Sequence, residues 1–431
     1  MSDRAKLILG DKENDFPIHI GTEGNRVIDI DGLFERTGHI TLDHAFSNTG
    51  ATTSKICYKE GETGSLGVLW YRGYAVEEIA RHCDFLEAAY LLIRGELPNV
   101  EQLQEFRRHI HRRTLLHEGM QALFAGFPPN AHPMAILGSV VGALAIYCTD
   151  ALDVSDPRQI ELATYHLLAK LPTIAAFGYK QSIGQPFIFP RNDLTYCQNF
   201  LHMMFAAPSE KYSMDPDYVE ALNAMLVLYG DHGQICSTST VRMGGSSDVN
   251  LFSCISAGIW AIWGDLHGSA NVTSINMLEQ IHDDRGNLGK YIELAKSPDA
   301  NFRLKGLGHP SYKNYDPRAK FAKDIFHDLL QKHPQRDPIF DLALQMENAV
   351  LSDPYFLERH LFPNLEFYSG LIFRILGIPK QMFTALFAIG RLPGWIAHWT
   401  EMHDTPNRRL YRSRQLYLGQ SRRAFVPLIK R

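Results

Sequence analysis

The chain has 431 residues, and 45% of them are hydrophobic, which is enough for the core of two or three domains. Its 43 basic and 47 acidic residues leave a net charge of −4, so the charge gives no reason to expect nucleic acid or an anionic membrane as a partner. No apolar run approaches the roughly 18 residues that a membrane-spanning helix needs.

The amino-terminal stretch alternates short apolar and polar pieces, such as residues 27–31, between glycines and aspartates. This pattern predicts small strands and turns over the first ~60 residues.

From Val76 onward, apolar residues recur every three or four positions, which predicts that most of the chain is helical. The clearest helical segments run over residues 85–92, 134–146, 160–171 and 219–228. Two further helices are predicted, one after His267 and one that begins at Asp316-Pro317, because aspartate caps a helix well and proline fits its first turn. No internal repeat and no low-complexity linker divides the chain.

The six cysteines are scattered and form no Cys-x-x-Cys pair, and the charged start, residues 1–4, shows no signal-peptide pattern. We therefore expect a reducing, cytoplasmic location.

Three polar side chains that could act together on a carbonyl compound lie between residues 306 and 366. His309 follows a Gly-Leu-Gly turn, Arg318 stands at a predicted helix start, and Glu366 lies among bulky apolar residues that could raise the pKa of its carboxyl. Such a set could polarise a carbonyl, hold an acid substrate and remove a proton. The ordinary alternatives are a tight turn, a salt bridge and a solvated surface glutamate.

Two histidines upstream could join this set. His267 precedes small residues at a predicted helix N-terminus, which would keep its imidazole neutral, although a capping histidine in a turn is the alternative. His232 adds a third imidazole. Since His232, His267 and His309 lack the close spacing of a zinc site, we expect no metal.

Arginines among tryptophans and histidines mark residues 391–414. Arg391 and Arg412 suit bidentate binding of carboxylates, although charge of this kind is more often a surface or subunit contact.

Taken in order, several stretches resemble citrate synthases of the type typical of Gram-negative bacteria, and the resemblance extends from the amino-terminal strands to Arg431. The most specific stretches are residues 237–242, 312–318, 352–356, 367–370, 394–399 and 414–417.

The resemblance implies an all-α, mainly helical two-domain fold with a small amino-terminal β region, whose domains close over the substrates. We place the strand region at residues 1–60, the large helical domain at 61–269 and 385–431, and the small helical domain at 270–384. It also implies a homodimer or a hexamer built as a trimer of dimers.

The resemblance also implies a role for each candidate residue. His267 matches the histidine that binds the acetyl-CoA enol, His309 the one that polarises the 2-oxo acid, and Glu366 the base that removes the methyl proton. The acceptor-binding positions are His232, Arg318, Arg391 and Arg412, the last contributed by a neighbouring subunit. The coenzyme A contacts are Lys305, Gly306, Leu307, Gly308 and Lys313. Acetyl-CoA is a co-substrate, and no further cofactor is expected.

Departures from the family pattern cluster at these positions. The family's base is an aspartate, and one extra methylene at Glu366 moves a carboxylate by ~1 Å, which can cost ~100-fold in rate unless the pocket has adjusted. Gly233 stands in place of a glutamate, Ser269 of a glycine and Pro310 of an arginine. Pro393 would remove a backbone hydrogen bond within a helical stretch and kink it. We infer a reshaped acceptor pocket.

The sequence therefore predicts a Claisen-type condensation of acetyl-CoA with a small dianionic 2-oxo acid, followed by hydrolysis of the thioester. Oxaloacetate, which gives citrate, and phosphonopyruvate, which gives 2-phosphonomethylmalate, both fit. The third alternative is a catalytically silent metabolite-binding homologue, and the presence of both His267 and His309 argues against it.

The resemblance to the bacterial branch also implies a site at which NADH inhibits the enzyme. This chain matches that site only in part. The matching positions are Arg112, His117 and Lys170, and those that differ are Arg113, Cys148 and His166. The sequence leaves inhibition by NADH open.

Overall fold

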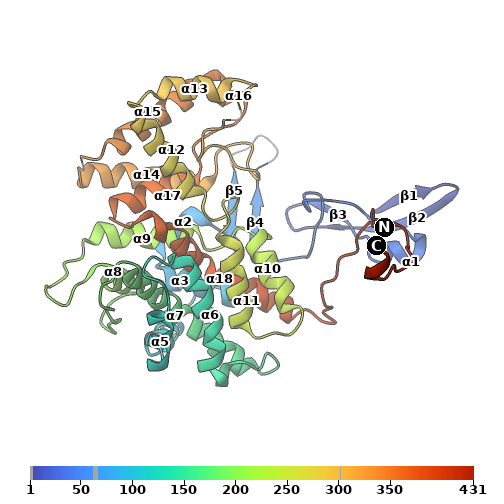
Figure 1. Ribbon diagram of the computed structural model, residues 1–431, viewed down its shortest axis with the longest axis horizontal. Coiled ribbons are helices and arrows are strands. Elements are labelled where there is room, and N and C mark those ends of the chain that lie inside the picture. Colours follow the sequence, from blue (N-terminus) through green and yellow to red (C-terminus); the bar gives the residue numbers. More distant parts are fainter. Residues whose placement is uncertain (1–2, 62–66, 301, 335) are drawn as a thin grey trace. The chain divides into compact units, whose positions relative to one another are not determined.

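The protein is mainly helical, as predicted, with two small sheets (Figure 1). A computed structural model describes residues 3–61, 67–300, 302–334 and 336–431. The strands are β1 (Arg4–Leu9), β2 (Lys12–Ile20), β3 (Arg26–Ile28), β4 (Cys57–Glu60), β5 (Val68–Tyr71) and β6 (Tyr74–Ala75). The helices up to residue 228 are α1 (Leu33–Thr37), α2 (Val76–His82), α3 (Phe85–Arg94), α4 (Val100–His111), α5 (Gln121–Ala125), α6 (Pro133–Tyr147), α7 (Pro157–Ser182), α8 (Tyr196–Phe205) and α9 (Pro216–Leu228).

The helices of the second half are α10 (Cys236–Gly245), α11 (Leu251–Ile262), α12 (Ala270–Asp283), α13 (Leu288–Lys296), α14 (Pro317–Lys332), α15 (Pro338–Ser352), α16 (Pro354–Glu358), α17 (Leu365–Ile375) and α18 (Phe383–His403). Within the described ranges, no helix combines the length and the apolar character that crossing a membrane requires.

Both sheets are antiparallel and three-stranded, in the orders β1-β2-β3 and β4-β5-β6. The hairpin between β1 and β2 turns at Gly10, whose φ of 60° is a left-handed conformation that glycine adopts without strain. The prediction of short amino-terminal strands is confirmed, and β5 and β6 extend the strands to Ala75.

By their internal contacts the residues form two compact units, one of Met1–Thr53 with Tyr411–Arg431 and one of Ser54–Leu410. The carboxyl-terminal tail thus belongs with the first sheet. The separation of the helical part into a large and a small domain at residues 270 and 384 stays a prediction.

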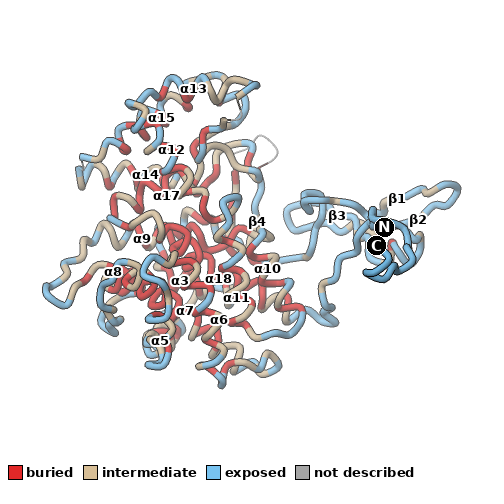
Figure 2. The backbone as a smooth tube through the Cα atoms, in the orientation of Figure 1, coloured by how far each residue is buried: buried red, intermediate tan, exposed pale blue. Residues whose placement is uncertain are grey.

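Within the helical unit, α18 is the central helix. It packs against α3, α9, α10 and α11, and both Trp395 and Trp399 are fully buried. Figure 2 shows these helices at the buried centre of the unit. The helix runs from Phe383 to His403 and contains Pro393, where the sequence predicts a kink.

The predicted start of α14 is confirmed. Asp316 is its N-cap and accepts a hydrogen bond from the Arg318 N–H at 3.0 Å, with Pro317 in the first turn. Ala322, Phe326 and Leu329, spaced three or four residues apart on α14, are buried.

Candidate active site

The turn after α9 and the loop before α14 bring two of the predicted histidines together. The ring centroids of His232 and His309 are 5.1 Å apart, although the two residues are 77 positions apart in the chain. His232 Nε2 also forms a 2.9 Å hydrogen bond with the hydroxyl of Tyr312. Burial lowers the pKa of His232 well below its ordinary value, so this imidazole is neutral.

The loop that carries His309 is held in a fixed shape. Gly306 and Gly308 have φ values of 79° and 71°, which only glycine adopts readily. The Asn364 side chain donates to the Gly308 carbonyl at 2.8 Å, and the Gly306 carbonyl accepts from the Asn364 N–H at 2.9 Å. The turn therefore both positions His309 and rests on the start of α17.

His309 is a neutral hydrogen-bond donor. Its Nδ1 accepts from the Ser311 N–H at 3.0 Å, so the ring proton is on Nε2. Desolvation lowers the pKa of His309 to about 4, and the positive charge of Arg318 contributes. A neutral imidazole with a free N–H can polarise a carbonyl oxygen without donating a full proton.

His267 lies in the turn before α12 and is also neutral. Its Nε2 accepts from the Ser237 N–H at 3.3 Å and lies 2.8 Å from the Ser237 hydroxyl, which leaves the proton on Nδ1. Desolvation, followed by the charge of Arg391, lowers the pKa of His267 to about 4. His267 is neutral, as the sequence suggests. The cause is burial of the imidazole rather than the nearby helix terminus.

Glu366 lies in the first turn of α17, where Asn364 is the N-cap and accepts from the Glu366 and Phe367 N–H groups. Its Oε2 atom is buried and has no hydrogen-bond partner within the part of the chain that the structure describes. Desolvation raises the pKa of Glu366 to about 7, against the opposing effects of Arg318 and Arg391. A carboxylate in this state can accept a proton near neutral pH.

The two buried arginines differ in their partners. Arg318 makes two hydrogen bonds to Asp316, from Nε at 3.1 Å and from Nη2 at 2.8 Å, which is the salt bridge that the sequence left open. Arg391 is 1% exposed, and its Nε donates to the Tyr229 carbonyl at 2.5 Å. Its Nη1 is buried without a partner among the described residues. An unpaired buried guanidinium favours an anionic ligand.

The other predicted site residues are not assembled in the same way. Lys305 and Lys313 are exposed, at the two ends of the glycine loop and the following turn. Arg412 is exposed and belongs to the unit that contains the tail.

Sequence reasoning missed a second set of buried groups beside these residues. Asp231 is fully buried and lies 3.1 Å from His398 Nε2, which together with Arg391 holds the pKa of Asp231 below its ordinary range. Tyr229 is fully buried, its hydroxyl accepts from the Asn271 amide at 3.5 Å, and it contributes to lowering the pKa of Glu366. The sequence signal that could have revealed Asp231 and Tyr229 is that both lie within three residues of His232 in the chain.

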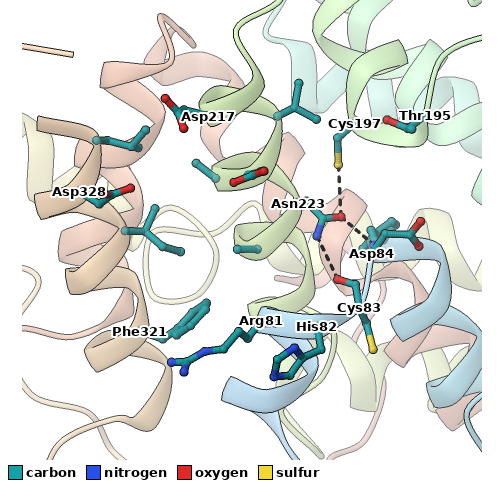
Figure 3. Close-up of a pocket in the computed structure, with 18 of the residues that line it drawn as sticks. Arg81, His82, Cys83, Asp84, Thr195, Cys197, Asp217, Asn223, Phe321 and Asp328 are labelled. Atoms are coloured by element: carbon teal, nitrogen blue, oxygen red, sulfur yellow. Dashed lines mark hydrogen bonds between the residues drawn. The ribbon is translucent and has the colours of Figure 1, made fainter. Parts of the chain in front are cut away.

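A pocket of about 570 Å³ lies elsewhere, between α2, α9 and α14 (Figure 3). Arg81 stacks over the Phe321 ring at 5.5 Å on one side of it, and the Asn223 side chain donates to the Cys83 carbonyl on the other. None of the predicted site residues lines this pocket. We therefore base the candidate active site on the side chains around Glu366.

One carboxylate and imidazole cluster, Asp215, Asp217 and His333, has ligand atoms within 4.8 Å of one another. Lys332 and His333 already pair with Asp217 at 3.0 and 2.9 Å, which explains the cluster without a metal. Of the positions that resemble the NADH site, Lys170 is buried, and its ammonium donates to the carbonyls of Arg113 and Leu115.

Comparison with known proteins identifies the family of the chain. Residues 45–414 match the protein family described as "Citrate synthase, C-terminal domain". This chain belongs to the citrate synthase family.

Its relatives in that family match over nearly the whole chain. Citrate synthase 1 of Mycobacterium tuberculosis is 49% identical over 426 residues, which is 99% of this chain and 98% of the relative. Among solved structures, citrate synthase from Pyrobaculum aerophilum matches with a TM-score of 0.80 and 33% identity over 96% of this chain and 98% of its own. Citrate synthase from Thermoplasma acidophilum, in a ternary complex with carboxymethyl coenzyme A and oxaloacetate, has a TM-score of 0.81 and 25% identity over 91% of this chain and 100% of its own.

The chain is thus an acyltransferase of the citrate synthase family. The roles that we assign to single residues within the family's active site are proposals.

Proposed function

We propose that this chain condenses acetyl-CoA with oxaloacetate and hydrolyses the resulting thioester to citrate and free coenzyme A. The relatives named citrate synthase support the reaction, and the complex of the Thermoplasma acidophilum structure supports the substrates. The observation that carries the assignment within this chain is the buried, unpartnered carboxylate oxygen of Glu366, which is within the electrostatic reach of the same Arg318 and Arg391 that act on the neutral imidazoles of His309 and His267.

In the proposed reaction, the Glu366 carboxylate removes a proton from the methyl group of acetyl-CoA. The Nδ1–H of His267 donates to the thioester oxygen, which stabilises the enol that forms. The enol carbon then attacks the 2-oxo carbon of the acceptor, while the Nε2–H of His309 donates to the carbonyl oxygen. Water finally attacks the thioester carbonyl, the C–S bond breaks, and the thiol leaves with a proton.

The acid groups of the acceptor are proposed to bind to His232, Arg318, Arg391 and Arg412. Arg391 has the strongest support, because its buried Nη1 has no partner in the described structure. We propose Lys305, Gly306, Leu307, Gly308 and Lys313 as the coenzyme A contacts, with no cofactor beyond this co-substrate.

We also propose that the chain works as a homodimer or hexamer in the cytoplasm. The six cysteines are free in the described structure, as a reducing compartment would keep them. The unit of the termini is the one formed by residues 1–53 and 411–431. Of its described large apolar residues, only Phe16 and Leu33 are buried and many others are exposed, which favours a second copy of the chain that covers them.

The reaction is tested by following free thiol release from acetyl-CoA with oxaloacetate, phosphonopyruvate, 2-oxobutyrate and pyruvate as acceptors. We expect oxaloacetate to give the highest kcat/KM. The comparisons give no support to phosphonopyruvate, so preferential use of that acceptor would replace the proposed substrate. If none of the four acceptors leads to thiol release, the proposed reaction is refuted.

The base is tested by Glu366→Gln, with Glu220→Gln, at an exposed position of α9, as the control. Because an amide cannot accept the methyl proton, we expect Glu366→Gln to lose thiol release by about 100-fold or more. Oxaloacetate binding, measured by calorimetry, should persist. Turnover that survives in Glu366→Gln would show that another group is the base.

A further inference from the structure

Lys59 on β4 connects to the loop that carries His309. Its Nζ donates to the Ser311 hydroxyl at 3.2 Å, and the Ser311 N–H in turn donates to His309 Nδ1 at 3.0 Å. The ammonium is therefore two hydrogen bonds away from the imidazole that we assign to the acceptor carbonyl.

The same side chain also covers the turn that carries His232. Gly233 has a φ of 70°, and a methyl group in place of its hydrogen would lie 4.0 Å from Lys59 Cε. A larger side chain at residue 233 would compete with the lysine for this space. Lys59 thus lies beside both acceptor histidines, at the exposed edge of the site.

Two cations around these histidines, Arg391 and Lys59, form no ion pair with a carboxylate of the described residues. Arg318 is paired with Asp316, and Asp231 lies against His398. Arg391 Nη1 is unpaired, and none of the ion pairs between described residues includes Lys59. Lys59 also contributes to lowering the pKa of His232 and of His309, after desolvation and Arg318, so its charge acts within the site.

Two unpaired cations match an acceptor with two acid groups. The buried guanidinium of Arg391 can bind one carboxylate, and the ammonium of Lys59, at the opening, can bind the other. An acceptor with one acid group would leave Lys59 without a contact.

We propose that Lys59 is a further acceptor-binding residue, which contacts the second acid group of the 2-oxo acid and makes the enzyme prefer dianionic over monoanionic acceptors. This inference rests on the proposed function, and it adds a specificity determinant that the motif positions do not include.

The test uses the full-length protein and calorimetric titration with oxaloacetate or 2-oxobutyrate, in which a methyl group replaces the second carboxylate. Lys59→Met removes the charge and keeps most of the side-chain volume. Lys55→Met, four residues earlier at an exposed position, is the matched control. We expect Lys59→Met to weaken oxaloacetate binding about five- to ten-fold, as for a partly screened ion pair, and to change 2-oxobutyrate binding less than about two-fold.

Steady-state kinetics gives an independent reading. The KM for oxaloacetate should rise in Lys59→Met with a smaller change in kcat, because the lost contact holds the substrate rather than the transition state. Phosphonopyruvate, which carries more negative charge at its far end, should lose more affinity than oxaloacetate.

Unchanged oxaloacetate binding in Lys59→Met would overturn the proposal. An equal loss for oxaloacetate and 2-oxobutyrate would also overturn it, since Lys59 would then act through Ser311 on the shape of the site. The titrations contain no acetyl-CoA, so they measure acceptor binding separately from the reaction. If wild-type protein binds oxaloacetate but never releases thiol, the proposed reaction is refuted and the test of Lys59 stays valid.

Discussion

Three acidic side chains in the candidate site have different partners, and this difference identifies the base. Asp316 is neutralised by two hydrogen bonds from Arg318, and Asp231 lies against His398 and accepts from the Gly233 N–H at 3.1 Å. Glu366 and Asp231 each keep one buried oxygen without a partner among the described residues, but the pKa of Glu366 is raised to about 7, whereas that of Asp231 is lowered. A carboxylate held by strong partners is a poor proton acceptor, so Glu366 is the suitable base of the three.

The pH dependence of the reaction follows from this difference. The base must be unprotonated, so kcat/KM should fall as the pH drops through about 7, the pKa of Glu366. His267 and His309, with pKa values of about 4, stay neutral and add no second step between about pH 5 and 8. Initial rates from pH 5 to 9 measure this profile. A single step near 4.5 would indicate an ordinary, solvated carboxylate.

The same raised pKa affects stability. Below about pH 4.5 the carboxyl is protonated in the folded and unfolded states, and its neutral form fits the buried site. As the pH rises through 7, the folded state must hold a buried charge, and that stability is lost. At pH 8 we expect Glu366→Gln to raise the free energy of unfolding by about 2–3 kcal/mol relative to wild type, with no difference at pH 4.5.

Urea unfolding at the two pH values, followed by circular dichroism, measures this difference. Glu220→Gln, at an exposed position, should show no change at either pH. A Glu366→Gln variant that is less stable than wild type at pH 8 would contradict the burial of the charge.

At the scale of elements, Asn364 joins α17, which carries Glu366, to the glycine loop at residues 306–308. It caps α17 and donates to the Gly308 carbonyl, so a single side chain fixes the relative positions of Glu366 and His309. We expect Asn364→Ala to cost about 1–2 kcal/mol of stability, as for other lost N-caps, and to lower kcat at least about ten-fold.

The control is Asn99→Ala, which removes the capping box of α4, whose residues the site does not use. It should lose about 1 kcal/mol of stability and keep its kcat. Equal kcat in both variants would show that the link between α17 and the loop has no catalytic importance.

Element starts could be predicted where the signal is local. Five helices begin at an Asp-Pro pair, α7, α9, α14, α15 and α16, and in each the aspartate caps the first turn. Pro393 lies inside α18, which is buried on all sides and continues to His403 past the missing hydrogen bond, and the kink expected at this residue stays a prediction.

The site could be predicted only in part, for the same reason. The motif residues carried the resemblance, but the pairing of Asp231 with His398 joins positions 167 apart in the chain, and no local pattern reports it. Lys59 is 252 positions from Ser311, and its place beside the acceptor histidines is visible only once the chain has folded.

At the scale of the whole molecule, the unit of the termini is the least self-sufficient part. Its exposed large apolar residues are Leu7, Ile8, Ile20, Val27, Ile28, Ile30, Phe34, Ile40, Leu42, Phe46, Leu416, Tyr417, Leu418, Phe425, Val426, Leu428 and Ile429. So small a core cannot stabilise a unit of this size alone, and we expect a second copy to complete it.

Subunit mixing tests whether Arg412 acts in the partner's site. We expect Glu366→Gln and Arg412→Ala each to be inactive or impaired alone. If Arg412 crosses over, a mixed dimer has one site with both changes and one with neither. Random exchange should then restore about a quarter of wild-type activity, because about half of the dimers are mixed and half of their sites are intact. Activity that stays at the average of the two variants would place Arg412 in its own subunit's site.

The unpaired guanidinium of Arg391 has a consequence for the amount of enzyme in a cell. An empty site keeps the buried Nη1 of Arg391 without a partner among the described residues, whereas a bound carboxylate would pair with it, so the ligand-free protein is the more easily opened form. When the acceptor is scarce, a larger fraction of molecules is exposed to proteolysis. Metabolite supply would then set not only how fast the enzyme turns over but also how long it survives.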